Sequence, residues 1–156
     1  MFKAKGKLIY DPKTDTARFD SWWAKLDVSP SITRYYQYWV KRELGIKLNL
    51  PMWRSHISVI RGESPARMKG YLWKKYQGKE IEFTYSPDLR MSETYVWIPV
   101  QSEQLEAIRV ELGMKPTPKV PFHVTIGNTK GIIQNKERKS KFTKIFPWED
   151  NSLYFQ

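Results

Sequence analysis

The sequence contains two histidines, and both stand in the same local pattern. His56 begins the run His-Ile-Ser-Val, and His123 begins the run His-Val-Thr-Ile. In each run an apolar residue separates the histidine from a hydroxyl residue, Ser58 in the first and Thr125 in the second. Side chains alternate between the two faces of a β-strand. The spacing therefore predicts two strands that each carry an imidazole and a hydroxyl on one face and aliphatic residues on the other.

Two imidazoles and two hydroxyls are sufficient to cleave a phosphodiester by internal attack. One imidazole takes the proton of the nucleophile and the other protonates the leaving oxygen, since a histidine with a pKa of about 6.5 can be neutral or charged near neutral pH. The hydroxyls of Ser58 and Thr125 would donate hydrogen bonds to the nonbridging oxygens, where charge develops. A single histidine on a strand is more often a satisfied polar residue. The matched pair favours one catalytic site formed by His56, His123, Ser58 and Thr125, with no metal ion.

The elements expected around the histidines form two similar halves. Each half runs from a strand through a capped helix that ends in glycine to a proline-containing approach and then to a histidine strand. This order predicts an α+β fold with two pseudo-symmetric lobes of antiparallel sheet and flanking helices around a central cleft. Apolar periodicity, caps and turn residues predict strands at 2–10, 52–60, 80–85, 93–100 and 122–127, and helices at 29–45, 64–78 and 102–113.

Composition bounds the class of protein. A length of 156 residues favours a single domain, which we place at residues 1–151, because residues 152–156 resemble the remnant of a processing-protease site. Lys and Arg outnumber Asp and Glu by 27 to 16, so a phosphate-bearing partner is expected. The absence of cysteine excludes disulfides and thiolate catalysis. No apolar run predicts a membrane span or a signal peptide, so a cytoplasmic protein is expected.

The paired His-x-Ser and His-x-Thr strands resemble those of the two-histidine (2H) phosphoesterase superfamily. Within it, the opening MFKAKGKLIYDPKTD, the segment WWAKLDVS and the aromatic-rich helix are similar to the phage anti-CBASS cyclic-nucleotide phosphodiesterases. The resemblance covers most of the chain. It implies a two-lobed α+β fold and a metal-independent, cofactor-free enzyme that cleaves cyclic di- and trinucleotide signals of bacterial antiphage immunity in the host cytoplasm, with no obligate protein partner. By motif, His56 and His123 match the catalytic histidines, and Ser58 and Thr125 match the phosphate-contacting hydroxyls.

Aromatic side chains are the expected holders of the nucleobases, since bases stack on ring faces. The candidates are Tyr10, at the end of the first strand, Trp73, beside two lysines, and Trp148, near a basic stretch. Glu149 could accept a hydrogen bond from a base amino group. The alternative for each ring is an ordinary core or surface aromatic, and for Glu149 an ordinary solvated carboxylate.

Two other functions fit the same sequence features. One is an RNA-end phosphodiesterase that acts on 2′,3′-cyclic phosphates, because the same pair of imidazoles could serve that reaction. The other is a nucleotide-binding or RNA-binding protein that uses charge and stacking without chemistry. The paired histidines argue against the second alternative.

Overall fold

Seven strands, two α-helices and one short 3-10 helix make up the described part of the chain. The structure is a computed structural model, and it describes residues 1–13, 22–51 and 53–132. The strands are β1 (Phe2–Tyr10), β2 (Trp23–Asp27), β3 (His56–Arg61), β4 (Glu80–Tyr85), β5 (Arg90–Met91), β6 (Tyr95–Gln101) and β7 (His123–Asn128). The helices are α1 (Pro30–Leu44), α2 (Glu103–Glu111) and the 3-10 helix η1 (Gly70–Leu72).

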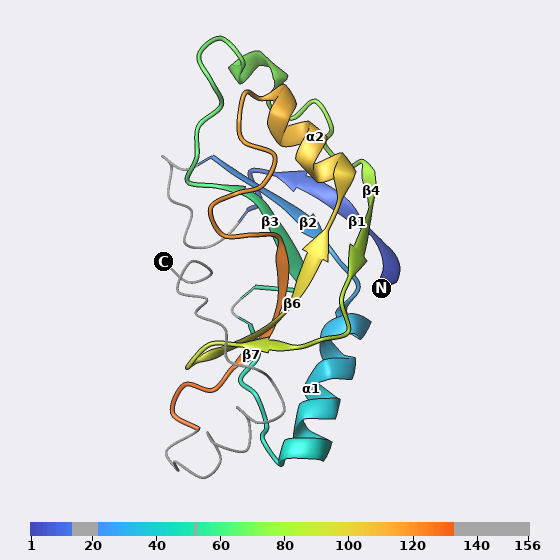
Figure 1. Ribbon diagram of the computed structural model, residues 1–156. Helices are drawn as coiled ribbons and strands as arrows, with labels where there is room; N and C mark the ends of the chain where they lie inside the picture. Colours follow the sequence, from blue (N-terminus) through green and yellow to red (C-terminus); the bar gives the residue numbers. More distant parts are fainter. Residues whose placement is uncertain (14–21, 52, 133–156) are drawn as a thin grey trace.

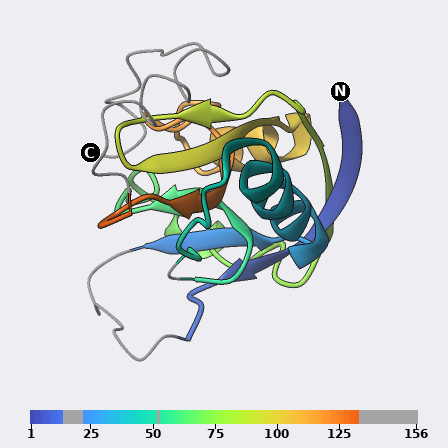
Figure 2. The same cartoon turned by 90° about the horizontal axis from the view of Figure 1, so that it is seen from below.

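All strands belong to one antiparallel sheet in the order β4-β1-β2-β3-β7-β6-β5. The strands β2, β3, β7 and β6 follow one another across this sheet when it is viewed from below (Figure 2). Because β4 pairs with both β1 and β6, six of the strands close into a ring, and β5 lies outside it beside β6. The sheet-rich α+β character predicted from the sequence is therefore confirmed.

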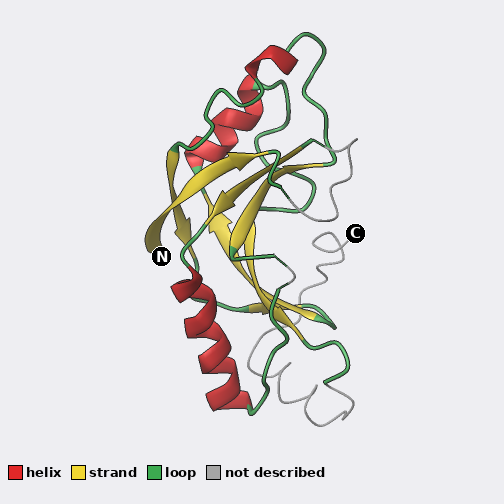
Figure 3. Ribbon diagram, turned by 180° about the vertical axis from the view of Figure 1, so that it is seen from behind, coloured by secondary structure: helices red, strands yellow, loops and turns green. Residues whose placement is uncertain are grey.

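The two α-helices lie at opposite ends of the sheet (Figure 1), and the view from behind shows the same separation (Figure 3). Helix α1 begins as predicted, because the hydroxyl of Ser29 accepts a hydrogen bond from the backbone N–H of Ser31 at 3.2 Å. It ends at Gly45, whose φ of 67° is a left-handed conformation that glycine adopts easily. Helix α2 is capped by Ser102, whose hydroxyl accepts from the N–H of Leu105 at 3.3 Å.

The helix predicted at residues 64–78 is wrong. Only the 3-10 helix η1 forms there, and the rest of the segment consists of turns. Met68 and Lys74 have φ values of 66° and 68°, which are incompatible with a continuous right-handed helix. A helix here would place Met68 on one side together with Leu72, but the exposed fraction of Met68 is 83%. Backbone groups of this segment bond to other elements instead: the N–H of Ala66 donates to the carbonyl of Leu112 at 2.9 Å, and the N–H of Gly78 donates to the carbonyl of Leu8 in β1 at 2.7 Å.

The strand β2 was not predicted as a strand, although its sequence carries the signal. Residues Trp23–Asp27 alternate between half-buried and fully buried side chains, as expected for a strand with one face against the core. The predicted strand at residues 52–60 also starts later than expected, because β3 begins at His56.

The core lies on the aliphatic face of the sheet. Four side chains form a row across β2, β3, β7 and β6, where Leu26 pairs with Ile57, Ile57 with Val124, and Val124 with Ile98. Each of these side chains is 0% exposed. Burying such a row requires that the neighbouring positions along each strand face the other side. Within the described residues, neither α-helix combines the length and apolar character that a membrane span requires.

Candidate active site

The two histidine strands are neighbours in the sheet. Strand β3 pairs with β7 in antiparallel orientation, with Ile57 opposite Val124. This register sets His56 opposite Thr125 and Ser58 opposite His123. Residues directly opposite one another share a face of the sheet. The structure therefore brings the four predicted catalytic side chains together as two adjacent cross-strand pairs.

The alternation predicted for these strands is confirmed. In β3 the histidine and serine are half-buried and Ile57 is buried; in β7 the histidine and threonine are half-buried and Val124 is buried. Cross-strand partners have Cβ atoms about 5 Å apart, and diagonal neighbours, such as the two histidines here, are about 7–8 Å apart. A phosphate group is of the right size to contact side chains around such an array.

The two imidazoles are oriented by equivalent hydrogen bonds. The Nδ1 atom of His56 lies 2.6 Å from the carbonyl oxygen of Arg54, and Nδ1 of His123 lies 2.8 Å from the carbonyl oxygen of Pro121. In both cases the acceptor is two residues before the histidine. A carbonyl oxygen only accepts, so Nδ1 carries the proton in each ring. The neutral form of each imidazole then has its lone pair on Nε2, which is the form required of a base.

Burial lowers the pKa of both imidazoles below the usual value of 6.5. For His56, the charges of Lys25 and Arg61 lower the pKa further, and the carbonyl of Arg54 and the carboxylate of Asp27 partly oppose these effects. The pKa of His123 is also lowered by the charge of His56. A proton on His56 therefore disfavours a proton on His123.

These lowered pKa values predict a loss of stability in mild acid. Below pH 6.5 the unfolded chain binds protons at both imidazoles that the folded chain does not bind, so the free energy of unfolding falls as the pH falls. Thermal midpoints measured at about pH 7.5 and about pH 5.5 should show this decrease. A double variant with asparagine at both positions should show a smaller decrease than the parent. An equal decrease in both proteins would contradict the prediction.

A β-bulge follows each pair of polar residues. Along β2 and β3, Lys25 pairs with Ser58 but Ala24 pairs with Ile60, so Val59 is an extra residue. Along β6 and β7, the partners shift in the same way around one extra residue, Ile126. In both strands the extra residue comes directly after the hydroxyl residue. Bulges bend a strand and redirect its side chains, and they occur often beside active sites.

The carbonyl of each bulge residue accepts a hydrogen bond from a helix. Gln37 on α1 donates from Nε2 to the carbonyl of Ile126 at 2.9 Å. Arg109 on α2 donates from Nη1 to the carbonyl of Val59, also at 2.9 Å. Each helix thus fixes a histidine strand that belongs to the other half of the chain. The two bulges are held by the same kind of contact, although the side chains differ.

The contact from α2 is part of a buried network. Arg109 is 1% exposed, and its guanidinium forms a two-point ion pair with the carboxylate of Glu63, with N–O distances of 3.0 and 2.9 Å. Its Nε also donates to the carbonyl of Lys115 at 2.9 Å. Arg109 is not among the residues predicted from the sequence. A detectable signal was present, because Arg109 lies next to Ile108 on the apolar stripe of its helix, where a charge requires a partner.

The segment that enters β3 is also fixed by α1. The hydroxyls of Thr33 and Ser55 are 2.5 Å apart, and the N–H of Val28 donates to the carbonyl of Ser55 at 3.1 Å. Thr33 is one of the few buried polar residues among those described. The residue immediately before His56 is therefore held from both the helix and the end of β2.

The structure does not bring Tyr10 to the histidine face. Tyr10 pairs with Ala24 across β1 and β2, which sets it on the core face, and it is 4% exposed. Burial raises the pKa of its hydroxyl to about 12. Trp73 packs edge-on against two rings, with centroid distances of 4.9 Å to Tyr10 and 4.8 Å to Trp22. Its indole N–H donates to the carboxylate of Asp11 at 3.1 Å. These rings form an aromatic cluster at the end of the sheet.

The other two residues predicted to hold a nucleobase, Trp148 and Glu149, lie outside the described residues. Among residues 1–13, 22–51 and 53–132, no group of three or more His, Cys, Asp and Glu side chains is placed to hold a metal ion. The structure thus describes all of the predicted catalytic residues but only Tyr10 and Trp73 of the residues predicted to hold a nucleobase.

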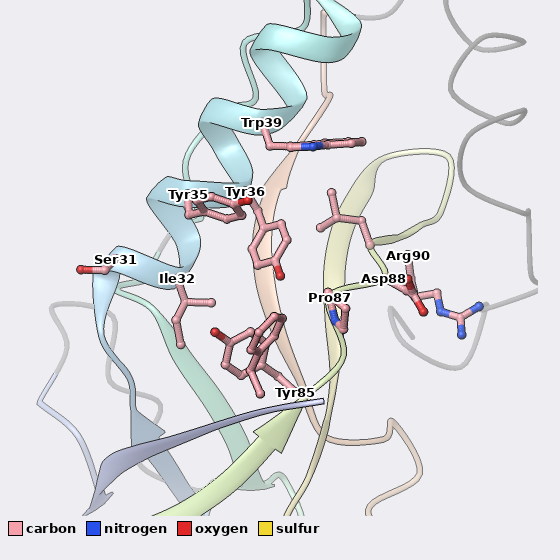
Figure 4. Close-up of a pocket in the computed structure, with 11 residues that line it drawn as sticks. Ser31, Ile32, Tyr35, Tyr36, Trp39, Tyr85, Pro87, Asp88 and Arg90 are labelled. Carbon is pink, nitrogen blue, oxygen red and sulfur yellow. The ribbon is translucent and has the colours of Figure 1, made fainter.

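A large cavity lies elsewhere, between α1 and the turn that joins β4 to β5 (Figure 4). Its volume is about 940 Å³. Helix α1 contributes Tyr36 and Trp39 from one side, and Asp88 and Arg90 come from the other. Neither histidine lines it. Tyr35, which also lines the cavity, is 61% exposed.

Comparisons of the chain with protein-family models, with curated proteins and with solved structures find no match. A function for this chain therefore has to be argued from the residues and the geometry described above.

Proposed function

We propose that this chain is a metal-independent phosphodiesterase of the 2H type that cleaves 3′–5′ bonds in cyclic di- and trinucleotides. One observation carries the proposal: His56, Ser58, His123 and Thr125 come from two distant parts of the sequence and form adjacent pairs on one face of the sheet. Two oriented imidazoles beside two hydroxyl donors are the groups that internal attack on a phosphodiester requires.

The arrangement of the elements supports a further part of the proposal, that the halves are pseudo-symmetric lobes around a cleft. The first half runs β1-β2-α1-β3 and the second runs β4-β5-β6-α2-β7. In each half the histidine strand pairs with the strand before the helix, β2 in the first and β6 in the second. The equivalent bulges and imidazole contacts follow the same relation, which would place the scissile phosphate between the two lobes.

The proposed reaction uses the ribose 2′-hydroxyl next to the scissile phosphate as the nucleophile. The neutral imidazole of one histidine takes the 2′-hydroxyl proton at Nε2 as the oxygen bonds to phosphorus. The other histidine, protonated at Nε2, gives its proton to the departing 5′-oxygen as the P–O bond breaks. Ser58 and Thr125 donate hydrogen bonds to the nonbridging oxygens. The products are a 2′,3′-cyclic phosphate and a 5′-hydroxyl, and no step requires a metal ion.

The choice of cyclic signals as substrates, with evasion of bacterial CBASS immunity as their purpose, rests on the resemblance of the sequence to phage anti-CBASS enzymes. The excess of 27 basic over 16 acidic residues supports a polyanionic substrate of some kind. The geometry of the four side chains fits any phosphodiester with a neighbouring hydroxyl, so the class of nucleotide is the part that most needs a direct test.

The test is an assay of purified protein against a panel of 3′,3′-cyclic di- and trinucleotides in excess EDTA. Mass spectrometry should find linear products that carry a 2′,3′-cyclic phosphate. Activity that disappears only when EDTA is present would overturn the metal-free mechanism. Cleavage of RNA ends that bear 2′,3′-cyclic phosphates, in preference to cyclic dinucleotides, would favour the RNA-end enzyme instead. Tight binding followed by release of intact nucleotide would favour a binding protein.

A further inference from the structure

Trp23 lies on the same face of the sheet as the proposed catalytic residues. In β2, Lys25 is opposite Ser58 and Asp27 is opposite His56, and Trp23 follows on that face by alternation. Its ring centroid is 6.5 Å from that of His56, with the rings at 73°. The indole Nε1 is buried and has no hydrogen-bond partner among the described residues. A half-buried ring with an unused donor thus stands directly beside one imidazole.

A cation lies over this ring. Arg61 is opposite Trp23 in the register of β2 and β3, and its Cζ atom is 5.0 Å from the ring centroid. Arg61 is exposed, so the guanidinium has one side on the indole and one toward solvent. Nucleobases stack on aromatic rings and on guanidinium planes alike. Trp53 supports the indole from its edge, with ring centroids 6.0 Å apart.

The second half of the chain has a similar pair at the equivalent place. Tyr95 on β6 is opposite Asn128 on β7, five residues beyond His123, just as Arg61 is five residues beyond His56. The ammonium of Lys130 lies 5.1 Å from the Tyr95 ring centroid. The bulge in each histidine strand keeps these positions on the polar face. An aromatic ring with a cation therefore lies beyond the histidine pair in both directions.

We propose that Trp23 with Arg61, and Tyr95 with Lys130, are two nucleotide subsites on either side of the scissile phosphate. In the first, the indole of Trp23 and the guanidinium of Arg61 hold a base by stacking, and in the second the ring of Tyr95 does so. In both, the cation attracts the phosphate attached to that nucleotide. The ligand class is then at least two nucleotides joined through a phosphodiester, rather than a mononucleotide or a free phosphate. This inference rests on the proposed function, because it takes the phosphate at the histidines as the centre of the ligand.

The test measures binding, so that it does not depend on turnover. In a His123→Asn background, isothermal titration calorimetry with 3′,3′-cyclic GMP–AMP should show a Kd about 10- to 100-fold weaker for Trp23→Ala, the range expected for loss of one stacked base. Trp23→Phe keeps a ring and should stay within about threefold of the background protein. Arg61→Met should weaken binding by about tenfold. Arg61→Lys should recover only part of that loss, because lysine restores the positive charge but has no planar group on which a base can stack.

The matched control is Tyr38→Ala, which removes an aromatic ring that is 61% exposed on α1 and should leave the Kd unchanged. An RNA dinucleotide with one abasic ribose should bind the background protein more weakly than the same dinucleotide with both bases. The Trp23→Ala substitution should then cause little further loss of affinity for it. Binding by Trp23→Ala and Arg61→Met within twofold of the background would overturn the subsites, even if the parent enzyme cleaves cyclic dinucleotides. If these two variants bind more weakly but the parent protein cleaves no cyclic dinucleotide, the subsites stand and the phosphodiesterase function is rejected.

Discussion

Replacing His56 or His123 with asparagine should lower the turnover of a 3′,3′-cyclic dinucleotide by about 10²- to 10⁴-fold, which is the usual contribution of one general acid or base. Asparagine is the informative replacement because its amide N–H can still donate to the carbonyl of Arg54 or Pro121, to which each imidazole is bonded. It cannot exchange a proton near neutral pH. Quenched-flow or steady-state assays with mass-spectrometric detection of the linear product would measure the loss.

The double variant sharpens this prediction. Residues that act as one catalytic unit show effects that do not add, so the variant with both asparagines should be little slower than the slower single variant. Thermal midpoints at neutral pH should change little, because asparagine keeps the hydrogen bond to the carbonyl of Arg54 or Pro121. A single variant that retains more than about a tenth of the parent turnover would contradict the assignment of that histidine as an acid or base.

Replacing Arg109 with methionine should lower the free energy of unfolding by about 3 kcal/mol, at the low end of the range for breaking a buried ion pair. The change leaves the carbonyls of Val59 and Lys115 without a donor. It also leaves the carboxylate of Glu63 without its partner, but that side chain is 40% exposed and water can solvate it in part. Urea denaturation at neutral pH would measure the difference.

A matched substitution separates this effect from the general loss of an arginine. Arg42 lies on α1 with its side chain 69% exposed, and Arg42→Met should change the free energy of unfolding by less than about 0.5 kcal/mol. At temperatures where Arg109→Met is folded, its kcat should change more than its KM. The reason is that Arg109 supports the bulge that redirects the strand carrying His56. Unchanged stability in Arg109→Met would show that the network does not hold this strand.

The local structure of the site could be predicted from the sequence. The His-x-Ser and His-x-Thr spacing was enough to predict two strands with polar residues on one face, because the period of a strand is fixed by its backbone. Ser29 and Ser102 marked the starts of both α-helices by their capping chemistry. The pairing of the histidine strands was beyond such rules, since residues 56 and 123 are far apart in the chain.

The features that the sequence did not reveal depend on tertiary contacts. The bulge at Val59 inserts an extra residue into a strand that contains no glycine or proline, so the sequence gives no warning of it. The bulge at Ile126 is followed by Gly127, and a glycine inside a strand is a signal that could have indicated it. The segment at residues 64–78 has helical spacing, but contacts with the end of the sheet decide its conformation. Tyr10 looked available beside a turn, yet its register with Ala24 faces it toward the core.

The pairing between the two histidine strands is the narrowest link in the ring of strands. It has a single register pair, Ile57 with Val124, whereas β1 and β4 are joined by six pairs on the other side of the ring. Strand pairing between the halves is therefore weakest beside the histidines, and the side chains of Gln37 and Arg109 join the halves there instead. The face that carries the two imidazoles is thus held in shape mainly by side chains from the two helices, and substitutions in either helix should disturb it more than substitutions between β1 and β4.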